Sequence, residues 1–191
     1  MSKFWRLLLT LTLPLLLAWG GGGCAAPVVA DPLTGKFGGN EPEAQLEFWH
    51  SLAQRPIASN DEAFHALLLY LDGKGPAGDY AGRVAELKRR RALPGGFDRP
   101  AQEAVERGTL AVALVRTLNL DGGWALTLLG PTPRYATREL QYLGLFPPST
   151  PRQTFSGMDV VGVIGRVEDY QRGDAADAPA AVLPGEIPRA R

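Results

Sequence analysis

Apolar residues recur at helical spacing in six stretches of the chain, and proline, glycine or polar residues separate these stretches. Over residues 59–73, Phe64, Leu68 and Leu71 share one face of a helix, and Gly73 ends it. The same spacing predicts helices over the ranges 45–52, 84–93, 107–118, 136–145 and 157–168. The pattern therefore predicts a mainly α fold.

The six predicted helices group into three helix-loop-helix units. Leu68, Leu114 and Ile164 occupy one position in the second helix of each unit, and such positions recur at intervals of about 50 residues, a length typical of helical repeats. We expect the units to pack as a pseudo-symmetric helical bundle over residues 41–170. An unrelated six-helix domain is the alternative interpretation.

One short apolar run, within residues 121–131, lies between the second and third units. It is bounded by Gly123 and by Gly130 followed by Pro131, which allows one strand or an extended loop. Because no partner strand is evident, we favour the loop.

The N-terminal residues have the pattern of an export signal. Lys3 and Arg6 precede an apolar run over residues 7–17, which is too short to span a bilayer stably. Cys24 follows three glycines, and this arrangement resembles the lipobox of bacterial lipoproteins. The resemblance implies that residues 1–23 are a signal peptide and that Cys24 is diacylated with palmitate-type chains and becomes the new N-terminus. Cleavage nearby by an ordinary signal peptidase, with Cys24 as a free thiol, is the alternative.

Segments rich in proline and glycine flank the predicted domain. Residues 24–40 have no sustained hydrophobic period, so we expect a flexible tether. Residues 171–191 contain Pro179, Pro184 and Pro188 among small and polar residues, so we expect a disordered tail.

The overall charge argues against a polyanion-binding protein such as a nucleic-acid binder. The chain has 20 basic and 20 acidic residues, and removal of the signal would take away Lys3 and Arg6. No second apolar run has the length of a transmembrane helix, so we expect membrane attachment through Cys24 only. His50 and His65 are the only histidines, and neither a metal-ligand spacing nor a catalytic triad order is present. We expect no metal, no cofactor and no enzymatic activity.

The three units resemble the S-layer homology module, a helix-loop-helix of about 50 residues that usually occurs in three copies. Leu143-Gly144-Leu145 matches the Leu-Gly-Ile step of that family, and residues 105–111 align with its Val-Thr-Arg-Ala-Glu-Phe-Ala motif. The resemblance implies a domain that holds a cell-wall polymer in grooves between units. The motif arginine is present at Arg107 and is replaced by Asp61 and Gly157 in the other copies, which weakens the expectation of acidic-glycan binding.

Four features are candidates for ligand contact. The resemblance points to Arg107, for which we expect an exposed guanidinium, with Arg116 on a different side of the same helix as an internal control. Trp124 and Tyr135 have side chains that stack on sugar rings or fill a core. The basic run over residues 88–91 is spread around a helix, which favours a solvated face over contact with acidic lipid head groups or glycan.

Together these patterns predict a non-catalytic lipoprotein of the cell envelope, exported and held on the periplasmic or outer-membrane side. Its partners would be the membrane, through Cys24, and a cell-wall glycan or envelope protein. The main alternative is a periplasmic protein–protein adaptor built from helical repeats. An enzyme acting on glycans is a third class, which no residue pattern supports.

Overall fold

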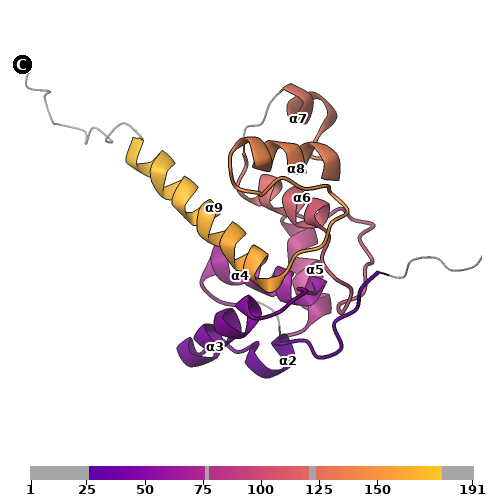
Figure 1. Cartoon of the computed structure of the whole chain (residues 1–191), viewed down its shortest axis with the longest axis vertical. Coiled ribbons are helices and arrows are strands. Elements are labelled where there is room, and N and C mark those ends of the chain that lie inside the picture. Colours follow the sequence, from indigo (N-terminus) through magenta and orange to yellow (C-terminus); the bar gives the residue numbers. More distant parts are fainter. Residues whose placement is uncertain (1–25, 76–77, 121–123, 178–191) are drawn as a thin grey trace, which may run out of the picture.

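The computed structural model describes residues 26–75, 78–120 and 124–177, and this part of the chain is mainly α-helical, as predicted (Figure 1). The helices are α2 (Thr34–Phe37), α3 (Pro42–Ala53), α4 (Asn60–Asp72), α5 (Tyr80–Arg89), α6 (Arg107–Thr117), α7 (Trp124–Leu129), α8 (Pro133–Tyr142) and α9 (Gly157–Asp177). Within the described residues there is no multi-residue strand, only isolated bridges. The six predicted helices correspond to α3, α4, α5, α6, α8 and α9.

Side chains at the helix ends explain where several helices begin and stop. The Ser59 side chain accepts from the backbone N–H of Glu62, and the Glu62 side chain accepts from the N–H of Ser59, a capping box that begins α4. Gly73, with φ of 68°, ends α4 in the left-handed conformation that glycine adopts without steric cost. Asp79 and Thr132 cap α5 and α8 in the same way as Ser59.

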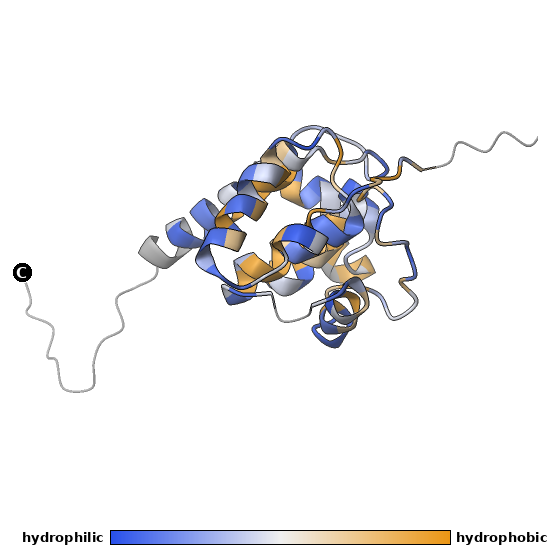
Figure 2. Ribbon diagram, turned by 90° about the horizontal axis from the view of Figure 1, so that it is seen from below, coloured by the Kyte–Doolittle hydropathy of each residue, from blue (hydrophilic) through white to orange (hydrophobic). Residues whose placement is uncertain are grey.

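Helix α4 lies at the centre of the domain. It contacts α5 on one side and α9 on another, while α9 also packs on α3 and α6 packs on α8. Every side chain of α4 from Asn60 to Leu69 is buried, including the apolar Phe64 and Leu68. Apolar residues of the neighbouring helices belong to the same buried core, and the ribbon of Figure 2 shows hydrophobic and hydrophilic residues alternating along these helices. The core is therefore built mainly by helix-on-helix packing, to which buried residues of the connecting segments, such as Val105 and Phe155, contribute.

The segments that precede α4, α6 and α9 are joined by a closed ring of three backbone hydrogen bonds. The N–H of Val105 donates to the carbonyl of Ala58 at 2.9 Å, the N–H of Ala58 to that of Phe155 at 2.9 Å, and the N–H of Phe155 to that of Val105 at 3.3 Å. All three residues are buried. Because each residue donates once and accepts once, each segment contacts the other two. The pseudo-symmetric packing of three whole units stays a prediction.

The helix starts also correct the expected register of the first unit. The N-caps of α4 and α6 are Ser59 and Glu106. Counted from these caps, Leu67 is the counterpart of Leu114, whereas the sequence alignment had chosen Leu68. Leu67 and Leu68 are both fully buried, so the hydrophobic pattern alone does not distinguish them.

The flanking segments differ from the expected tether and tail. Within the tether range 24–40, residues 28–37 pack on the domain: Val29 and Leu33 are buried, and the Leu33 N–H donates to the Glu62 carboxylate at 3.1 Å. Helix α9 continues to Asp177, past the expected start of the tail at residue 171. Residues 178–191 and the signal segment 1–23 lie outside the described residues.

The segment between the second and third units is also different from the prediction. Residues 124–129 form the short helix α7, where we expected a loop and considered a strand. Helix α7 contacts α8. A six-residue helix is too short for the apolar period to separate it from an extended run, which explains the error.

Candidate functional site

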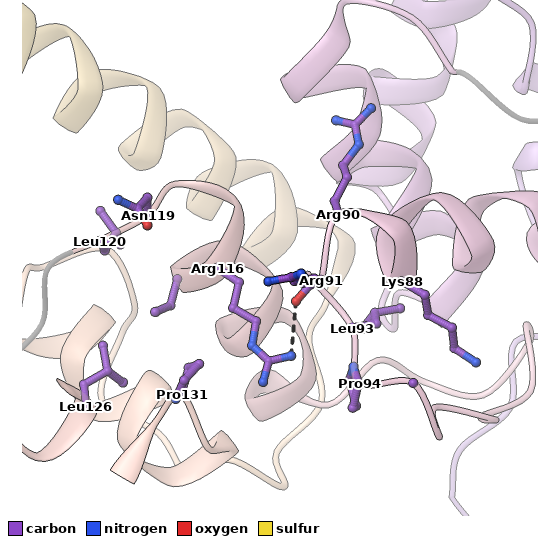
Figure 3. A pocket seen from close by; sticks show the side chains of 12 residues that line it. Lys88, Arg90, Arg91, Leu93, Pro94, Arg116, Asn119, Leu120, Leu126 and Pro131 are labelled. Carbon is purple, nitrogen blue, oxygen red and sulfur yellow. Dashed lines mark hydrogen bonds between the residues drawn. The ribbon is translucent and has the colours of Figure 1, made fainter. Parts of the chain in front are cut away.

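A pocket of about 820 Å³ lies at the C-terminal ends of α5 and α6 (Figure 3). Its walls include the apolar side chains of Leu93, Leu120 and Leu126, and Pro131 lies beside Leu126. Its cationic lining residues come from two helix ends that are far apart in the sequence: Lys88, Arg90, Arg91 and Arg116. The pocket therefore joins an apolar wall to a cluster of positive charges.

The end of α5 places Arg91 in this pocket. Arg91 has φ of 60°, in the left-handed region, and the next two N–H groups, of Ala92 and Leu93, both donate to the carbonyl of Leu87. This is the hydrogen-bond pattern of a helix that stops at a left-handed residue. Ala92 and Leu93 are buried, so the turn is anchored in the core while Arg91 stays exposed.

The corresponding turn in the third unit has glycine where the second unit has Arg91. Gly144 follows α8 with φ of 73°, and the N–H groups of Leu145 and Phe146 both donate to the carbonyl of Leu140. Glycine adopts this conformation freely, whereas a residue with a Cβ loses about 1 kcal/mol there. Arg91 is therefore held at a position that its backbone preference disfavours.

The other left-handed residue that is not glycine, within the described ranges, lines the same pocket. Asn119 follows α6 with φ of 48°, and the N–H of Leu120 donates back to the carbonyl of Val115. Asparagine tolerates this conformation better than most residues. Two helix ends in left-handed geometry thus shape one pocket.

The arginines of the pocket differ in whether they have an ion-pair partner. The Arg90 guanidinium is directed away from Arg116 (Figure 3) and forms ion pairs with Asp72 at 2.7 Å and with Glu86 at 2.6 Å. Arg91 and Arg116 lie close together, and one Arg116 nitrogen donates to the backbone carbonyl of Arg91 at 3.1 Å.

No acidic side chain is among the described residues that line the pocket. Asp121 follows Leu120 in the chain and lies outside the described residues. Arginines that line one pocket without a carboxylate partner favour the binding of an anion there.

The ion pairs next to the pocket shift the pKa values of their members in opposite directions. Hydrogen bonds from Arg89 and then Arg90 lower the pKa of Glu86 to about 2. The hydrogen bond to Asp72 is the main cause of the raised pKa of Arg90. Both groups are therefore fully charged near neutral pH, and Arg90 has its charge compensated inside the protein.

The structure places Arg107 in the ring of helix starts, where its side chain is 12% exposed. Its guanidinium lies over the Phe155 ring, 4.8 Å from the ring centroid, and forms an ion pair with Asp159 at 3.2 Å. One nitrogen also donates to the backbone carbonyl of Thr154. The expectation of an exposed guanidinium was therefore wrong. Arg116, chosen as the internal control, lines the pocket at the ends of α5 and α6, which we call the basic pocket.

The remaining predicted site residues are not brought together by the described structure. Tyr135 lies on α8 and is partly buried against the core. Trp124 is the first residue of α7, but its side chain is outside what the structure describes, and so is Cys24.

The two histidines lie apart from the pocket. His50 is on α3, where its ring is hydrogen-bonded to Gln54. His65 is fully buried on α4, with its ring 4.6 Å from that of Phe48 and no hydrogen-bond partner for either nitrogen. Burial, and then the nearby Arg83 charge, lower its pKa to about 4, so His65 is neutral. Among the described residues there is no cluster of three potential metal ligands.

A second groove, of about 870 Å³, lies at the opposite end of α6, near the starts of α6 and α8. Arg99, Arg134 and Arg152 line it, together with Glu106. Arg99 is paired with Glu103 at 2.5 Å and with Glu106 at 3.1 Å. Arg134 and Arg152 are exposed and form no ion pair with the described part of the chain.

Comparison with known proteins gives no relative of this chain: no family model, no curated protein and no solved structure matches it. None of the described helices combines the length and hydrophobicity that crossing a bilayer requires.

Proposed function

We propose that this protein is a non-catalytic lipoprotein of the bacterial cell envelope that docks an acidic cell-wall polymer in the basic pocket. The observation that carries the proposal is the pair Arg91 and Arg116, two arginines that line one pocket with no carboxylate among its described lining residues. Guanidinium groups bind carboxylates and phosphates through paired hydrogen bonds. The apolar wall beside them suits the carbon faces of sugar rings.

The backbone of Arg91 supports the same conclusion. A glycine at this turn would be more stable, as Gly144 is in the third unit. An arginine at a disfavoured position is consistent with a role for its charge beyond folding, because strained residues concentrate at functional sites.

Retention of the protein on purified sacculi tests the proposal. Arg91→Gly removes the guanidinium and at the same time relieves the backbone, so lost binding cannot result from unfolding. We expect retention to weaken by at least about fivefold, corresponding to about 1 kcal/mol for one charge-assisted hydrogen bond. Arg116→Gln should weaken it similarly.

Arg89→Gln is the matched control. Arg89 belongs to the same basic run and its variant carries the same change in net charge, but its side chain is 71% exposed and does not line the pocket. We expect normal retention. Equal binding by wild type, Arg91→Gly and Arg116→Gln would exclude the pocket as the docking site. Loss of binding confined to Arg107→Lys would move the site to the position that the S-layer homology resemblance implies.

A periplasmic protein–protein adaptor is the second candidate. Leu128 and Leu129 on α7 are 73% and 53% exposed, an apolar pair of a kind that protein partners cover. Retention on sacculi that requires other envelope proteins, and that is lost in Leu128→Ser/Leu129→Ser, would favour the adaptor.

We also infer that the three helix pairs are arranged with pseudo-threefold symmetry. The ring formed by Ala58, Val105 and Phe155 supports this arrangement, because the three residues stand at equivalent places before α4, α6 and α9. Superposition of the three helix pairs in an experimental structure would test it, and a failure to superpose would leave a six-helix domain without internal repeats.

A further inference from the structure

The segment that follows Cys24 joins the domain after very few residues. The Pro27 carbonyl accepts from the N–H of Ala104 at 2.8 Å, and the N–H of Val29 donates to the carbonyl of Gln102 at 2.8 Å. Val28, between them, forms an isolated antiparallel bridge with Glu103. The chain is therefore attached to the domain from Pro27 onward.

This attachment limits the distance between an acylated Cys24 and the domain. Cys24 precedes Pro27 by three residues, and three residues span at most about 11 Å when fully extended. A 17-residue free tether over 24–40, as the sequence suggested, would have allowed several times that distance. With the attachment observed, an acylated Cys24 would hold the domain within about 11 Å of the bilayer surface.

We propose that the face around residues 27–29 and 99–103 lies against the membrane that holds Cys24, and that Arg134 and Arg152 contact its anionic head groups. The inference rests on the acylation of Cys24 in the proposed function. The two arginines adjoin this face through one chain of contacts: Val28 bridges Glu103, Glu103 pairs with Arg99, and Arg99 lines the groove that contains them.

The cations available beside this face are Arg134 and Arg152, because residues 98–106 carry three carboxylates and one arginine. Arg99 pairs with both Glu103 and Glu106 and so offsets one of these two carboxylates, and Asp98 is a further carboxylate in that stretch. Arg134 and Arg152 supply two exposed positive charges that have no ion-pair partner in the described residues. Basic side chains held near a membrane surface are attracted to its acidic lipids.

The C-terminal half of α9, which lies far from this face, carries more acidic than basic side chains. The C-terminal half of α9 extends away from the side where the chain enters the domain, and Figures 1 and 2 agree on this placement. Its exposed side chains include Glu168 and Asp169, which share the single cation Arg172. A domain oriented by the short attachment would thus direct this end away from an acidic bilayer.

Spin labelling of the acylated full-length protein tests the orientation. Acylation consumes the thiol of Cys24, the only cysteine, so a cysteine introduced at Gln102 or at Asp169 is the sole labelling site. The protein is placed in vesicles of phosphatidylcholine mixed with phosphatidylglycerol, with a nickel-chelating lipid as the relaxing agent. We expect strong relaxation at Gln102→Cys and little at Asp169→Cys.

The contribution of the arginines is measured separately. The double variant Arg134→Gln/Arg152→Gln should weaken binding of the non-acylated Cys24→Ser chain to phosphatidylglycerol vesicles by about 30-fold, or about 1 kcal/mol for each arginine. Binding to vesicles of phosphatidylcholine alone should not respond. Arg89→Gln/Arg172→Gln, with the same change in net charge, is the matched control and should bind normally.

The possible failures are distinguishable. An unmodified Cys24 in the mass spectrum of the mature protein would overturn the anchor itself. An acylated Cys24 with equal relaxation of both labels would overturn the orientation alone and leave the proposed docking function intact. Identical vesicle binding by the arginine variant and the wild type would overturn the head-group contact.

Discussion

The helix starts of α4, α6 and α9 and the helix ends of α5 and α6 use charged residues in opposite ways. At the helix starts each acidic group has an arginine partner, as in Arg107 with Asp159 at 3.2 Å. At the helix ends, Arg91 and Arg116 lie together with no described carboxylate beside them. Arg107 is therefore engaged within the fold, whereas Arg91 and Arg116 have no described carboxylate partner and are available for an external anion.

This contrast explains why net charge and motif matching were poor guides to the site. A formal net charge of zero conceals a local cationic cluster, because the acidic residues are distributed over the chain and none of the described ones lines the pocket. The arginine that matches a family motif, Arg107, is largely occupied within the protein. Availability of a charge, rather than its position in a motif, distinguishes the two regions.

The largest effect is expected where a paired charge at the helix starts is broken. Asp61 accepts from Arg83 at 2.5 Å, and both side chains are almost fully buried. Asp61→Ala should lower the free energy of unfolding by about 3 to 5 kcal/mol, because it removes one partner of a buried ion pair. Urea denaturation measures the loss. Lys36→Ala, which breaks the exposed pair with Asp31, is the control and should leave the melting temperature unchanged. A small effect for Asp61→Ala would contradict the contrast between the two regions.

A second large effect should appear on acidification. His65 is buried, with its pKa lowered from 6.5 to about 4 in the folded protein. Between these values the unfolded chain binds a proton that the folded protein does not, so stability falls as the pH drops from about 6.5 to 4, by about 2 to 3 kcal/mol in total. Unfolding curves across this range measure the slope.

Replacing the buried imidazole should flatten that slope. His65→Leu removes the titrating group, whereas His50→Gln changes the other histidine and should retain the wild-type dependence. An unchanged slope in His65→Leu would show that other groups cause the acid sensitivity.

Two glycines of α9 offer a smaller and matched test of the packing at the helix starts. A Cβ on Gly157 would lie 1.7 Å from the carbonyl oxygen of Leu52, whereas a Cβ on Gly165 would meet nothing within 4 Å. Gly157→Ala should therefore cost about 1 to 3 kcal/mol by overpacking. Gly165→Ala should stabilise α9 by about 0.5 to 1 kcal/mol through its higher helix propensity. Thermal melts of both variants give the comparison, and equal melting temperatures would mean that α9 does not approach α3 closely.

The smallest effects should occur at the helix ends, with signs opposite to each other. Arg91→Gly should stabilise the protein by about 1 kcal/mol, and Gly144→Ala should destabilise it by a similar amount, because both residues are left-handed. Differential scanning calorimetry resolves shifts of this size. Destabilisation by Arg91→Gly would show that the arginine contributes to folding, and its proposed role in ligand binding would lose its main support.

The hydrophobic period predicted the long helices because their apolar faces repeat over several turns, as Phe64, Leu68 and Leu71 do in α4. It failed at α7, which is too short to show a period. It also failed over residues 28–37, where Leu33 is held by a backbone hydrogen bond to Glu62, a contact between distant residues that no local pattern encodes.

The basic pocket was missed for a related reason. The sequence analysis treated residues 88–91 as one run spread around a helix, but α5 ends at Arg89, so Arg91 lies beyond it in a different direction. A signal was present: aligned with Leu143-Gly144-Leu145, the second unit has Arg91 where the third has glycine. Arg116 joins it through the packing of α6, which sequence alone does not provide.

The ring of backbone hydrogen bonds also limits how early folding can be completed while the chain is being synthesised. Its closing bond joins Ala58, in the first third of the chain, to Phe155, just before the last described helix. Contacts between residues so distant in sequence form late, because a long loop must be ordered first. A nascent chain that lacks Phe155 leaves the N–H of Ala58 and the carbonyl of Val105 without their native partners. Closure of the ring must therefore wait until Phe155 has been synthesised, so the packing of the three helix starts on one another is completed only with the last third of the chain.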